Sequence, residues 1–570
     1  MAPLPLSPST KLASRLAGWV CFLAFFGIST AHDSFFVGFH PPFTRVDQGE
    51  ANFWLAAAYL LTPASLLLGL GYGEWLADWT SPWSRRLEAL SDLNWRAWLA
   101  GLTALAAILA HAGNAFVLLG YPITDDEWAA RFGGQVLASG KVLVELPMPT
   151  DVFPTLFMWV KGTSLTSMDW LGTQAAWALA EVTHSGTWLF ALSAALTVPP
   201  LAWVLARRLS RSWALAGAVL AVTSPMAFTM SMSTHGHLHS RALFAWTLAL
   251  VLWGREQPSV GRGVLSGLAL GASFITRPFE TAFLAAPFIV LEAWEALRER
   301  GARIPWLAGA GVGWLLPVLL MVAHSHAVTG GWLPPRHSEG HTGAVQSDIA
   351  LWVKFGSNSA FNALRLGVWF AGPLGVFLCA AGALTDSFTR RLGAGVLSVL
   401  GLGLFHDNFG IHAVGPIHYS ECVVPLTVLA VHGLHRLAPF ILPSAATVAL
   451  LIGNLTFNAV QATSLHGQAL IQADIYDALE AAVPESSRPA VVLAPQFSKV
   501  WHVNDAFNRR GSWVFDWRRP KPDFSDDILI LHDRPGAVEV VRQAFPERTI
   551  LRLKAAQGEA LLRVTPVTAP

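Results

Sequence analysis

The chain has few charged residues: Asp, Glu, Lys and Arg together make up 13% of its 570 positions. In soluble globular proteins these four residues usually make up about 25%. Apolar residues account for 53% of the chain, and most of them lie in long runs. This composition excludes an ordinary soluble protein and predicts a polytopic membrane protein.

Cysteine and net charge are scarce as well. The three cysteines, Cys21, Cys379 and Cys422, all lie in or beside apolar runs, which excludes a disulfide framework and a cysteine metal cluster. The 38 Lys and Arg residues nearly balance the 37 Asp and Glu residues, for a net charge of +1. Such a balance excludes nucleic acid as the expected partner.

Apolar runs repeat along the chain at lengths near the roughly 20 residues that a helix needs to cross a bilayer. We expect about thirteen membrane-spanning helices, at residues 16–31, 53–70, 98–119, 188–206, 213–230, 238–253, 264–275, 279–294, 306–323, 366–384, 392–405, 422–434 and 440–455. The first run could instead be a signal peptide, because Lys11 and Arg15 precede it and small residues end it.

Basic residues cluster in alternate connections between these runs. The clusters are Lys11 and Arg15; Arg85, Arg86 and Arg96; Arg207, Arg208 and Arg211; Arg255 and Arg262; Arg298, Arg300 and Arg303; Arg390 and Arg391; and Arg436. Because basic loops remain in the cytoplasm, the N-terminus is predicted to be cytoplasmic. The long connections 120–186 and 324–365 and the segment after residue 458 are then outside.

The chain divides into two predicted domains. Residues 1–460 form a membrane-embedded domain, in which residues 121–186 are the first large outer loop with surface helices. Residues 461–570 are polar enough to form a small extracytoplasmic α/β domain, because short apolar runs alternate with helical patterns there. Those runs are 490–493, 513–515, 528–531 and 549–553.

Three consecutive carboxylates, Asp125, Asp126 and Glu127, precede an amphipathic stretch at residues 129–143, which we expect to lie on the membrane. One interpretation is structural: Thr124 or Asp125 caps a helix, and the acids of its first turn complement the helix dipole. The other is catalytic, because a desolvated carboxylate beside like charges gains proton affinity. The spacing leaves both interpretations open.

His235, His237 and His239 alternate at the start of an apolar run. Side chains two residues apart on a helix diverge by about 200°, so the alternation argues against all three sharing one metal. His235 and Asp126 remain the candidates for a possible divalent metal, and no other cofactor is indicated.

The segment from Pro122 to Glu127, followed by Gln135 to Lys141, resembles the first outer loop of the GT-C superfamily of integral membrane glycosyltransferases. The closest branches are the protein O-mannosyltransferases and the lipid A aminoarabinose transferases. Further fragments follow in the order of that superfamily: 205–209, 223–235, 267–278, 415–419 and 545–548. Two differences stand out: His418 occupies a position where the family has Arg, and an added pair of spans precedes the acidic loop, where the family usually has a single span.

The resemblance implies an inverting glycosyltransferase of the bacterial inner (plasma) membrane. Its donor would be a polyprenyl-phosphate-linked sugar, and its acceptor a hydroxyl on a protein, lipid or polysaccharide. Asp126 would be the catalytic base, with Glu127 and Asp125 beside it. The residues implied to contact the donor phosphate are Arg277, His235, His418, Tyr419, Arg336 and Lys141. No motif marks a second catalytic acid; the candidates in the outer loop are Asp151, Asp169 and Glu181.

Two other classes of function fit a polytopic chain. A transporter or lipid flippase would show internal repeats and ionisable residues at mid-membrane, and we find no repeat in the sequence. A non-enzymatic envelope assembly protein would not need Asp126 for its function.

Overall fold

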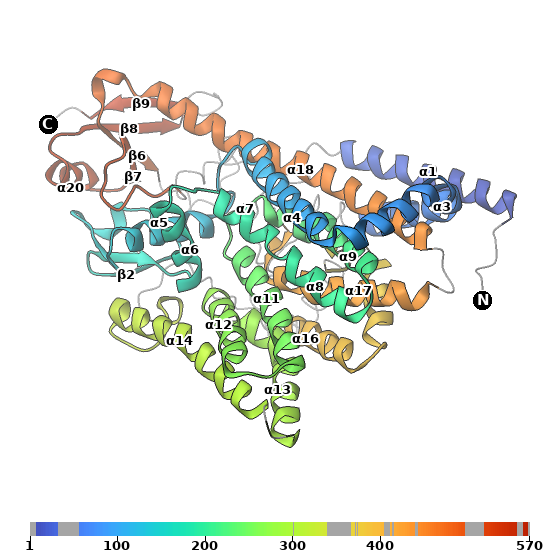
Figure 1. Cartoon of the computed structure of the whole chain (residues 1–570). Coiled ribbons are helices and arrows are strands. Elements are labelled where there is room, and N and C mark those ends of the chain that lie inside the picture. The colour runs from blue at the N-terminus through green and yellow to red at the C-terminus, as the bar shows by residue number, and fades with distance from the viewer. Residues whose placement is uncertain are drawn as a thin grey trace.

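The structure of the chain is a computed structural model. It describes residues 7–31, 56–299, 301, 303–338, 366–370, 372, 374–403, 411–412, 415–438, 443–495, 518–555 and 562–567. Helices make up most of it, and a small mixed sheet lies at the C-terminal end (Figure 1).

Several described helices are long and apolar enough to cross a membrane. Six stretches meet this condition: Pro8–Ile28, Trp95–Val117, Trp188–Arg208, Arg303–Thr329, Ile417–Leu437 and Ser444–Ala482. The bent pair Arg211–Thr223 and Pro225–Ser231, with 58° between its halves, could form a seventh span. The multi-pass helical architecture is therefore confirmed, and the total of about thirteen spans stays a prediction.

The helices before the outer loop are α1 (Pro8–Ala31), the π-helical turn η1 (Ala57–Leu61), α3 (Thr62–Leu93), α4 (Trp95–Ala112) and η2 (Gly113–Val117). The helices that follow the outer loop are α7 (Trp188–Ala195), α8 (Val198–Arg208), α9 (Arg211–Thr223), α10 (Pro225–Ser231), α11 (His237–Glu256), α12 (Val260–Thr276), α13 (Pro278–Glu299), α14 (Arg303–Thr329), α16 (Ser387–Gly403), α17 (Val423–Leu437) and α18 (Pro443–Ala482).

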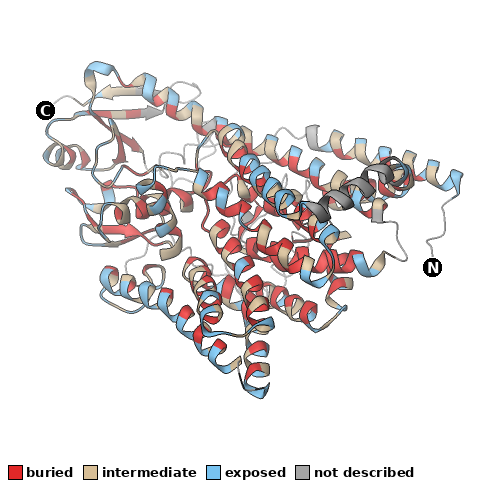
Figure 2. Ribbon diagram, viewed as in Figure 1, coloured by how far each residue is buried: buried red, intermediate tan, exposed pale blue. Residues whose placement is uncertain are grey.

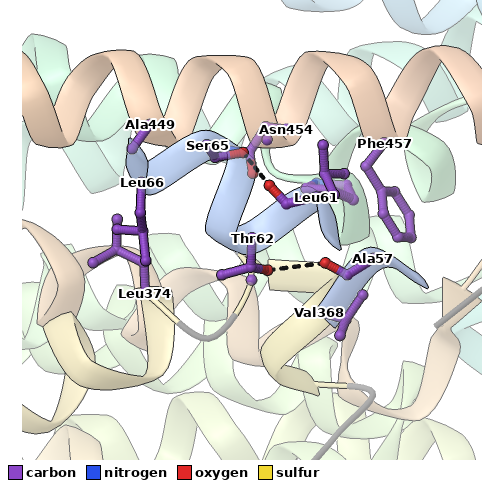
Figure 3. A pocket seen from close by; sticks show the side chains of 13 residues that line it. Ala57, Leu61, Thr62, Ser65, Leu66, Val368, Leu374, Ala449, Asn454 and Phe457 are labelled. Atoms are coloured by element: carbon purple, nitrogen blue, oxygen red, sulfur yellow. Dashed lines mark hydrogen bonds between the residues drawn. The ribbon is translucent and has the colours of Figure 1, made fainter. Parts of the chain in front are cut away.

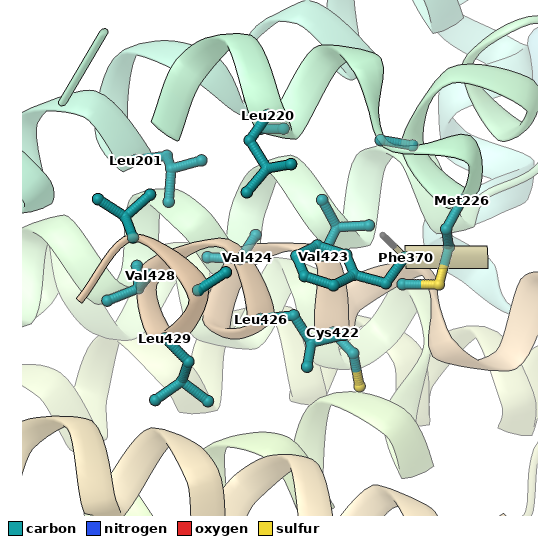
Figure 4. Packing of buried hydrophobic residues seen from close by; sticks show 14 of the residues in the cluster. Leu201, Leu220, Met226, Phe370, Cys422, Val423, Val424, Leu426, Val428 and Leu429 are labelled. Carbon is teal, nitrogen blue, oxygen red and sulfur yellow. The ribbon is translucent and has the colours of Figure 1, made fainter. Parts of the chain in front are cut away.

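Helix α17 lies at the centre of the membrane domain. Every residue from Val423 to Leu434 is buried, as Figure 2 shows. Leu201 of α8 and Leu220 of α9 pack on its side chains (Figure 4). By contrast, the outer helix α14 exposes large apolar side chains such as Leu320, at 65%. An apolar helix face without a protein partner is expected where lipid surrounds the protein.

Residues 121–186, predicted as the first outer loop, fold as a unit of their own. Helix α5 (Asp125–Ala138) packs on α6 (Leu171–Val182), and three short strands lie between them in sequence. These strands, β1 (Val144–Glu145), β2 (Met158–Lys161) and β3 (Ser164–Ser167), pair antiparallel in the order β1-β3-β2.

The C-terminal region combines a four-stranded sheet with one short helix. Its strands are β6 (Ala490–Pro495), β7 (Ile528–Asp533), β8 (Thr549–Ala555) and β9 (Leu562–Pro566), in the order β7-β6-β8-β9. β6 is parallel to β7 and β8, and helix α20 (Ala537–Ala544) lies between β7 and β8 in the chain. Three of the predicted apolar runs are strands, and the run at 513–515 lies outside the described residues. Helix α18 continues across the predicted domain boundary at residue 461. An unbroken helix therefore leads from the helical part of the chain to the sheet.

The outer loop and the C-terminal sheet share one apolar core. Ala129, Phe132 and Val136 of α5 are buried together with Leu493 and Leu529 of the sheet, and the two regions lie side by side in Figure 1. The apolar face of α5 therefore packs against protein, and the expectation that residues 129–143 lie on the membrane is wrong for this face. The shared core holds the start of α5 at a fixed place above the membrane helices.

Candidate functional site

Helix α5 begins with the cap that its sequence indicates. Thr124 is the N-cap: its hydroxyl accepts a hydrogen bond from the Glu127 N–H, and the Glu127 carboxylate accepts one from the Thr124 N–H. This reciprocal arrangement satisfies two backbone N–H groups that the helix leaves unpaired. The structural interpretation is therefore confirmed for Thr124 and Glu127.

Glu127 also joins α5 to the segment before α11. Its side chain is 1% exposed, and five donors reach its two oxygens. The Thr234 N–H and hydroxyl donate to Oε1 at 2.6 and 2.7 Å, and the Ile123 N–H, the Thr124 N–H and the Thr124 hydroxyl donate to Oε2 at 3.0 to 3.2 Å. A carboxylate held by so many donors is positioned rigidly.

His235 lies beside this carboxylate. Its Nε2 is 3.1 Å from the Thr124 hydroxyl oxygen, its Nδ1 is 3.0 Å from the Ser233 hydroxyl oxygen, and the ring is 5% exposed. Both ring nitrogens therefore have polar neighbours in the link between α5 and α11. A metal held by Asp126 and His235 stays a prediction.

Asp126 points to a different set of partners. Its Oδ1 lies 3.8 Å from Nη2 of Arg336, and its side chain is 25% exposed. Arg336 belongs to the short helix η4 (Pro335–His337), which follows α14. The triplet is thus divided: Glu127 is buried in a cap, while Asp126 faces a cation and remains accessible.

Asp169 is the acid that the structure brings to Asp126. It interacts electrostatically with Arg336, Asp126 and Arg277. Burial raises the pKa of Asp169, Arg336 opposes this rise and Asp126 adds to it. The two other candidates for a second catalytic acid have different partners. Asp151 pairs with Arg534 at 2.5 Å, and Glu181 lies 3.7 Å from Arg131.

Asp125 has its own environment at the start of α5. Burial, followed by the negative charge of Asp126, raises the pKa of Asp125 to about 7, although Arg519 of the C-terminal region opposes the rise. Its Oδ1 accepts a hydrogen bond from the Asp126 N–H at 3.0 Å. The C-terminal region therefore contributes a charge to this site.

Arg277 lies at the break between α12 and α13, where Pro278 begins the next helix. Its Nη2 is 2.8 Å from Oε1 of Glu280 and 2.9 Å from Nδ1 of His418, and the residue is 7% exposed. Its head group is therefore held inside the protein instead of reaching the interface. The Nε groups of Arg277 and Arg336 are buried and have no hydrogen-bond partner among the described residues. A buried donor without a partner carries a free-energy cost that an anionic ligand can remove.

Two buried glutamates complete this inner end of the site. Glu280 lies 2.9 Å from His418, and Glu421 lies 3.2 Å from Nδ1 of His237. His237, Glu280 and His418 form a group in which one ligand atom from each residue lies within 4.8 Å of the others. Glu280 and Glu421 were not among the site residues predicted from the sequence. Their signal is an acid within or beside an apolar run, which is rare and usually functional.

Two of the residues that the resemblance implies as phosphate contacts do not share the surroundings of Asp126. One lies far from Asp126, and the other is buried in the apolar core. Lys141 is exposed beyond the far end of α5, and roughly 20 Å of helix separates it from Asp126 at 1.5 Å per residue. Tyr419 is 2% exposed and packs in the main apolar core. Their roles at the donor phosphate stay predictions.

Two small cavities, of about 30 and 20 Å³, lie among the membrane helices. Figure 3 shows the first, between η1, α3 and α18, where the hydroxyls of Thr62 and Ser65 donate to backbone carbonyls. The second lies between α4, α8, α9 and α10 and is lined by Arg241 of α11. Arg241 is one helical turn from His237, so this second cavity lies close to the inner end of the charged site.

Comparisons with known proteins find resemblance in structure alone. No family model matches the chain, and no curated protein matches its sequence. ArnT from Cupriavidus metallidurans bound to undecaprenyl phosphate aligns with a TM-score of 0.52 and 11% identity, over 82% of this chain and 98% of ArnT. Its apo form aligns with a TM-score of 0.50 over 83% of this chain.

A third structure is more distant. The Archaeoglobus fulgidus oligosaccharyltransferase tethered with an acceptor peptide aligns with a TM-score of 0.42 and 10% identity, over 80% of this chain and 69% of that protein. The alignment with ArnT covers nearly all of ArnT and 82% of this chain. We conclude that the chain shares the fold of ArnT.

Proposed function

We propose that the protein is a membrane glycosyltransferase that moves a sugar from a polyprenyl-phosphate donor to an acceptor hydroxyl. We place the reaction on the outer face of a bacterial inner membrane, with the N-terminus in the cytoplasm and the C-terminal region outside. The observation that carries the proposal is the grouping of Asp126 and Asp169 with Arg336 and Arg277. Carboxylates beside arginines whose Nε–H groups have no partner suit a reaction in which a proton leaves the acceptor and a phosphate leaves the sugar of the donor.

Asp126 is the proposed base. It is the accessible carboxylate of the triplet, because Glu127 is buried in the helix cap and Asp125 interacts with Arg519. The acceptor oxygen would form a bond to the anomeric carbon of the sugar while its proton passes to Asp126. A positioned base typically contributes about 10²- to 10⁴-fold in rate.

The two arginines are the proposed phosphate ligands. As the bond between the sugar and the phosphate oxygen breaks, negative charge collects on the phosphate. The unpartnered Nε–H groups of Arg277 and Arg336 can donate to it, and charge-assisted hydrogen bonds of this kind strengthen as the charge develops. This single displacement inverts the configuration at the anomeric carbon.

Asp169 and Glu127 have supporting roles in this proposal. Asp169 would orient Arg336 and, with a raised pKa, could hold a proton near the acceptor. Glu127 would position the first turn of α5 by fixing it to Thr234. The other proposed contacts to the donor phosphate, His235, His418, Tyr419 and Lys141, would act around this centre.

The proposal is tested by supplying the purified protein with radiolabelled polyprenyl-phosphate sugars in native lipid. The expected result is label on a new acceptor and release of the free polyprenyl phosphate. Glu145→Gln is a suitable control, because Glu145 is a carboxylate of the same loop whose partners are Thr163 and Ser164. Absence of transfer from a panel of sugars by a correctly folded protein, together with lipid movement across the bilayer, would favour the transporter alternative.

A further inference from the structure

We propose that His237, Glu280 and His418 bind one divalent transition-metal ion, preferably Zn²⁺, beside the phosphate-binding arginine. The three residues come from α11, α13 and the short helix η5 (Ile417–Cys422), and one ligand atom from each lies within 4.8 Å of the others. His237 is 1% exposed and Glu280 is 6% exposed. Two buried groups and the half-buried His418, from three separate helices, therefore converge at one point.

The hydrogen bonding of His237 prepares it as a ligand. Its Nδ1 lies 3.2 Å from the Glu421 carboxylate. A cation bound to the ring favours the ionised form of Glu421, which can only accept; in the metal-bound state Nδ1 therefore carries the hydrogen and the lone pair of the neutral ring is on Nε2. That Nε2 is buried and has no hydrogen-bond partner among the residues that the structure describes.

Glu421 and His237 therefore reproduce the arrangement found behind metal-bound histidines. In that arrangement a carboxylate accepts the N–H of the ring, fixes its orientation and makes the other nitrogen a better donor. The unpartnered Nε2 is otherwise a buried acceptor with a desolvation cost. A metal ion at this nitrogen removes the cost.

The ligand set selects the kind of ion. Two imidazoles and one carboxylate suit zinc, whereas Mg²⁺ and Ca²⁺ prefer oxygen ligands alone. Three protein ligands also leave a fourth zinc position open. An oxygen of the donor phosphate is the group that the proposed function would place there.

The local charges predict how metal binding and phosphate binding depend on each other. Arg277 lies 2.8 Å from Glu280, and Arg241 interacts with Glu421. A divalent cation adds a charge of +2 beside these two arginines, and a phosphate offsets it. Metal and phosphate should therefore each bind more tightly in the presence of the other.

Metal content tests the site directly and without any assay of transfer. The purified full-length protein, equilibrated with Zn²⁺ and then desalted, should retain one ion per chain by elemental analysis. His237→Ala and His418→Ala should lose it. His239→Ala is the matched control, because His239 is a half-buried histidine of the same helix whose Nδ1 contacts the Ser193 hydroxyl instead of a carboxylate. No zinc in the unmodified protein, or equal zinc in His237→Ala, would overturn the proposal.

A second measurement covers the case in which the histidine variants do not fold. Glu421→Gln keeps the shape of the glutamate and should weaken zinc binding about 10- to 100-fold. Cobalt bound to the unmodified protein should give the visible spectrum of a four-coordinate site, and inorganic phosphate should tighten its binding. Unchanged affinity in Glu421→Gln would refute the site. Because the site is proposed from its own ligands, zinc binding with no sugar transfer would refute only the proposed function, and transfer without zinc would refute only the metal.

Discussion

At the scale of single residues, neighbouring carboxylates of one triplet have different surroundings. Glu127 is buried with five hydrogen-bond donors, Asp125 lies toward Arg519, and Asp126 faces Arg336. The side chains of consecutive helical residues point about 100° apart, which separates their environments. Three adjacent acids therefore need not share one role.

Glu127→Gln should destabilise the protein by about 1–3 kcal/mol, because the amide nitrogen of Gln faces donors that only an acceptor can satisfy. Thermal unfolding in detergent would measure the change. Glu181→Gln is the control, since Glu181 lies in the same outer loop at 33% side-chain exposure. A melting temperature of Glu127→Gln equal to that of the control would remove Glu127 from its positioning role.

Asp125 should make stability depend on pH. Its folded-state pKa of about 7 lies above the ordinary value, so folding favours the protonated form. The stability from this group is present at low pH and is lost as the pH rises from about 4 through about 7. In Asp125→Asn the side chain stays neutral, so the variant should gain stability over the unmodified protein as the pH increases across this range. Unfolding temperatures measured from pH 4 to pH 8 would contradict this account if the difference stayed constant.

At the scale of helices, close contact between α12 and α14 depends on glycine. A Cβ at Gly263 or Gly267 would meet the carbonyl oxygen of Trp306 or Ala310, and one at Gly313 would meet that of Val264. Small residues at such spacing let membrane helices approach closely. This packing holds the end of α12, where Arg277 lies.

Gly267→Ala should therefore destabilise the membrane domain by about 1–3 kcal/mol, the usual cost of overpacking. Gly311→Ala on α14 is its control, because a Cβ there meets nothing within 4 Å and alanine is the better helix former. The comparison is made by denaturation in the same detergent. Equal stability of the two variants would show that the helices are not held at this contact.

The start of α5 illustrates how far local sequence can predict structure. Thr124 was one of two N-caps predicted for this helix, and the structure confirms it. The surface on which α5 packs was not predictable, because the sheet residues that cover it, such as Leu493 and Leu529, lie far along the chain. Periodicity identifies an apolar face but not what covers that face.

At the scale of the whole molecule, the polytopic helical class followed from composition and from the order of apolar runs, and the alignment with ArnT supports it, while the number of spans stays a prediction. The site was less predictable. Asp126 meets Asp169 and Arg336, and His237 meets Glu421 and His418, only after several helices have packed. No spacing in the sequence encodes such contacts, so the choice of Asp169 over other acids required the structure.

The orientation in the membrane is a separate prediction for the whole chain. A reporter that is active only outside the membrane should be active after Gly140 and after Pro570, and silent after Arg208, because basic loops stay inside. Expression levels of the three fusions serve as the control. Activity after Arg208 with silence after Gly140 would invert the topology and place Asp126 in the cytoplasm.

Asp126→Asn in the sugar-transfer assay tests the central claim most directly. The amide keeps the shape of the side chain but loses its charge and proton affinity, so transfer should fall by at least about 10²-fold. Donor binding and thermal stability should remain close to those of the unmodified protein, because Thr124 and Glu127 still cap the helix. Transfer by Asp126→Asn at the rate of the unmodified protein, with the same donor and acceptor, would contradict the account.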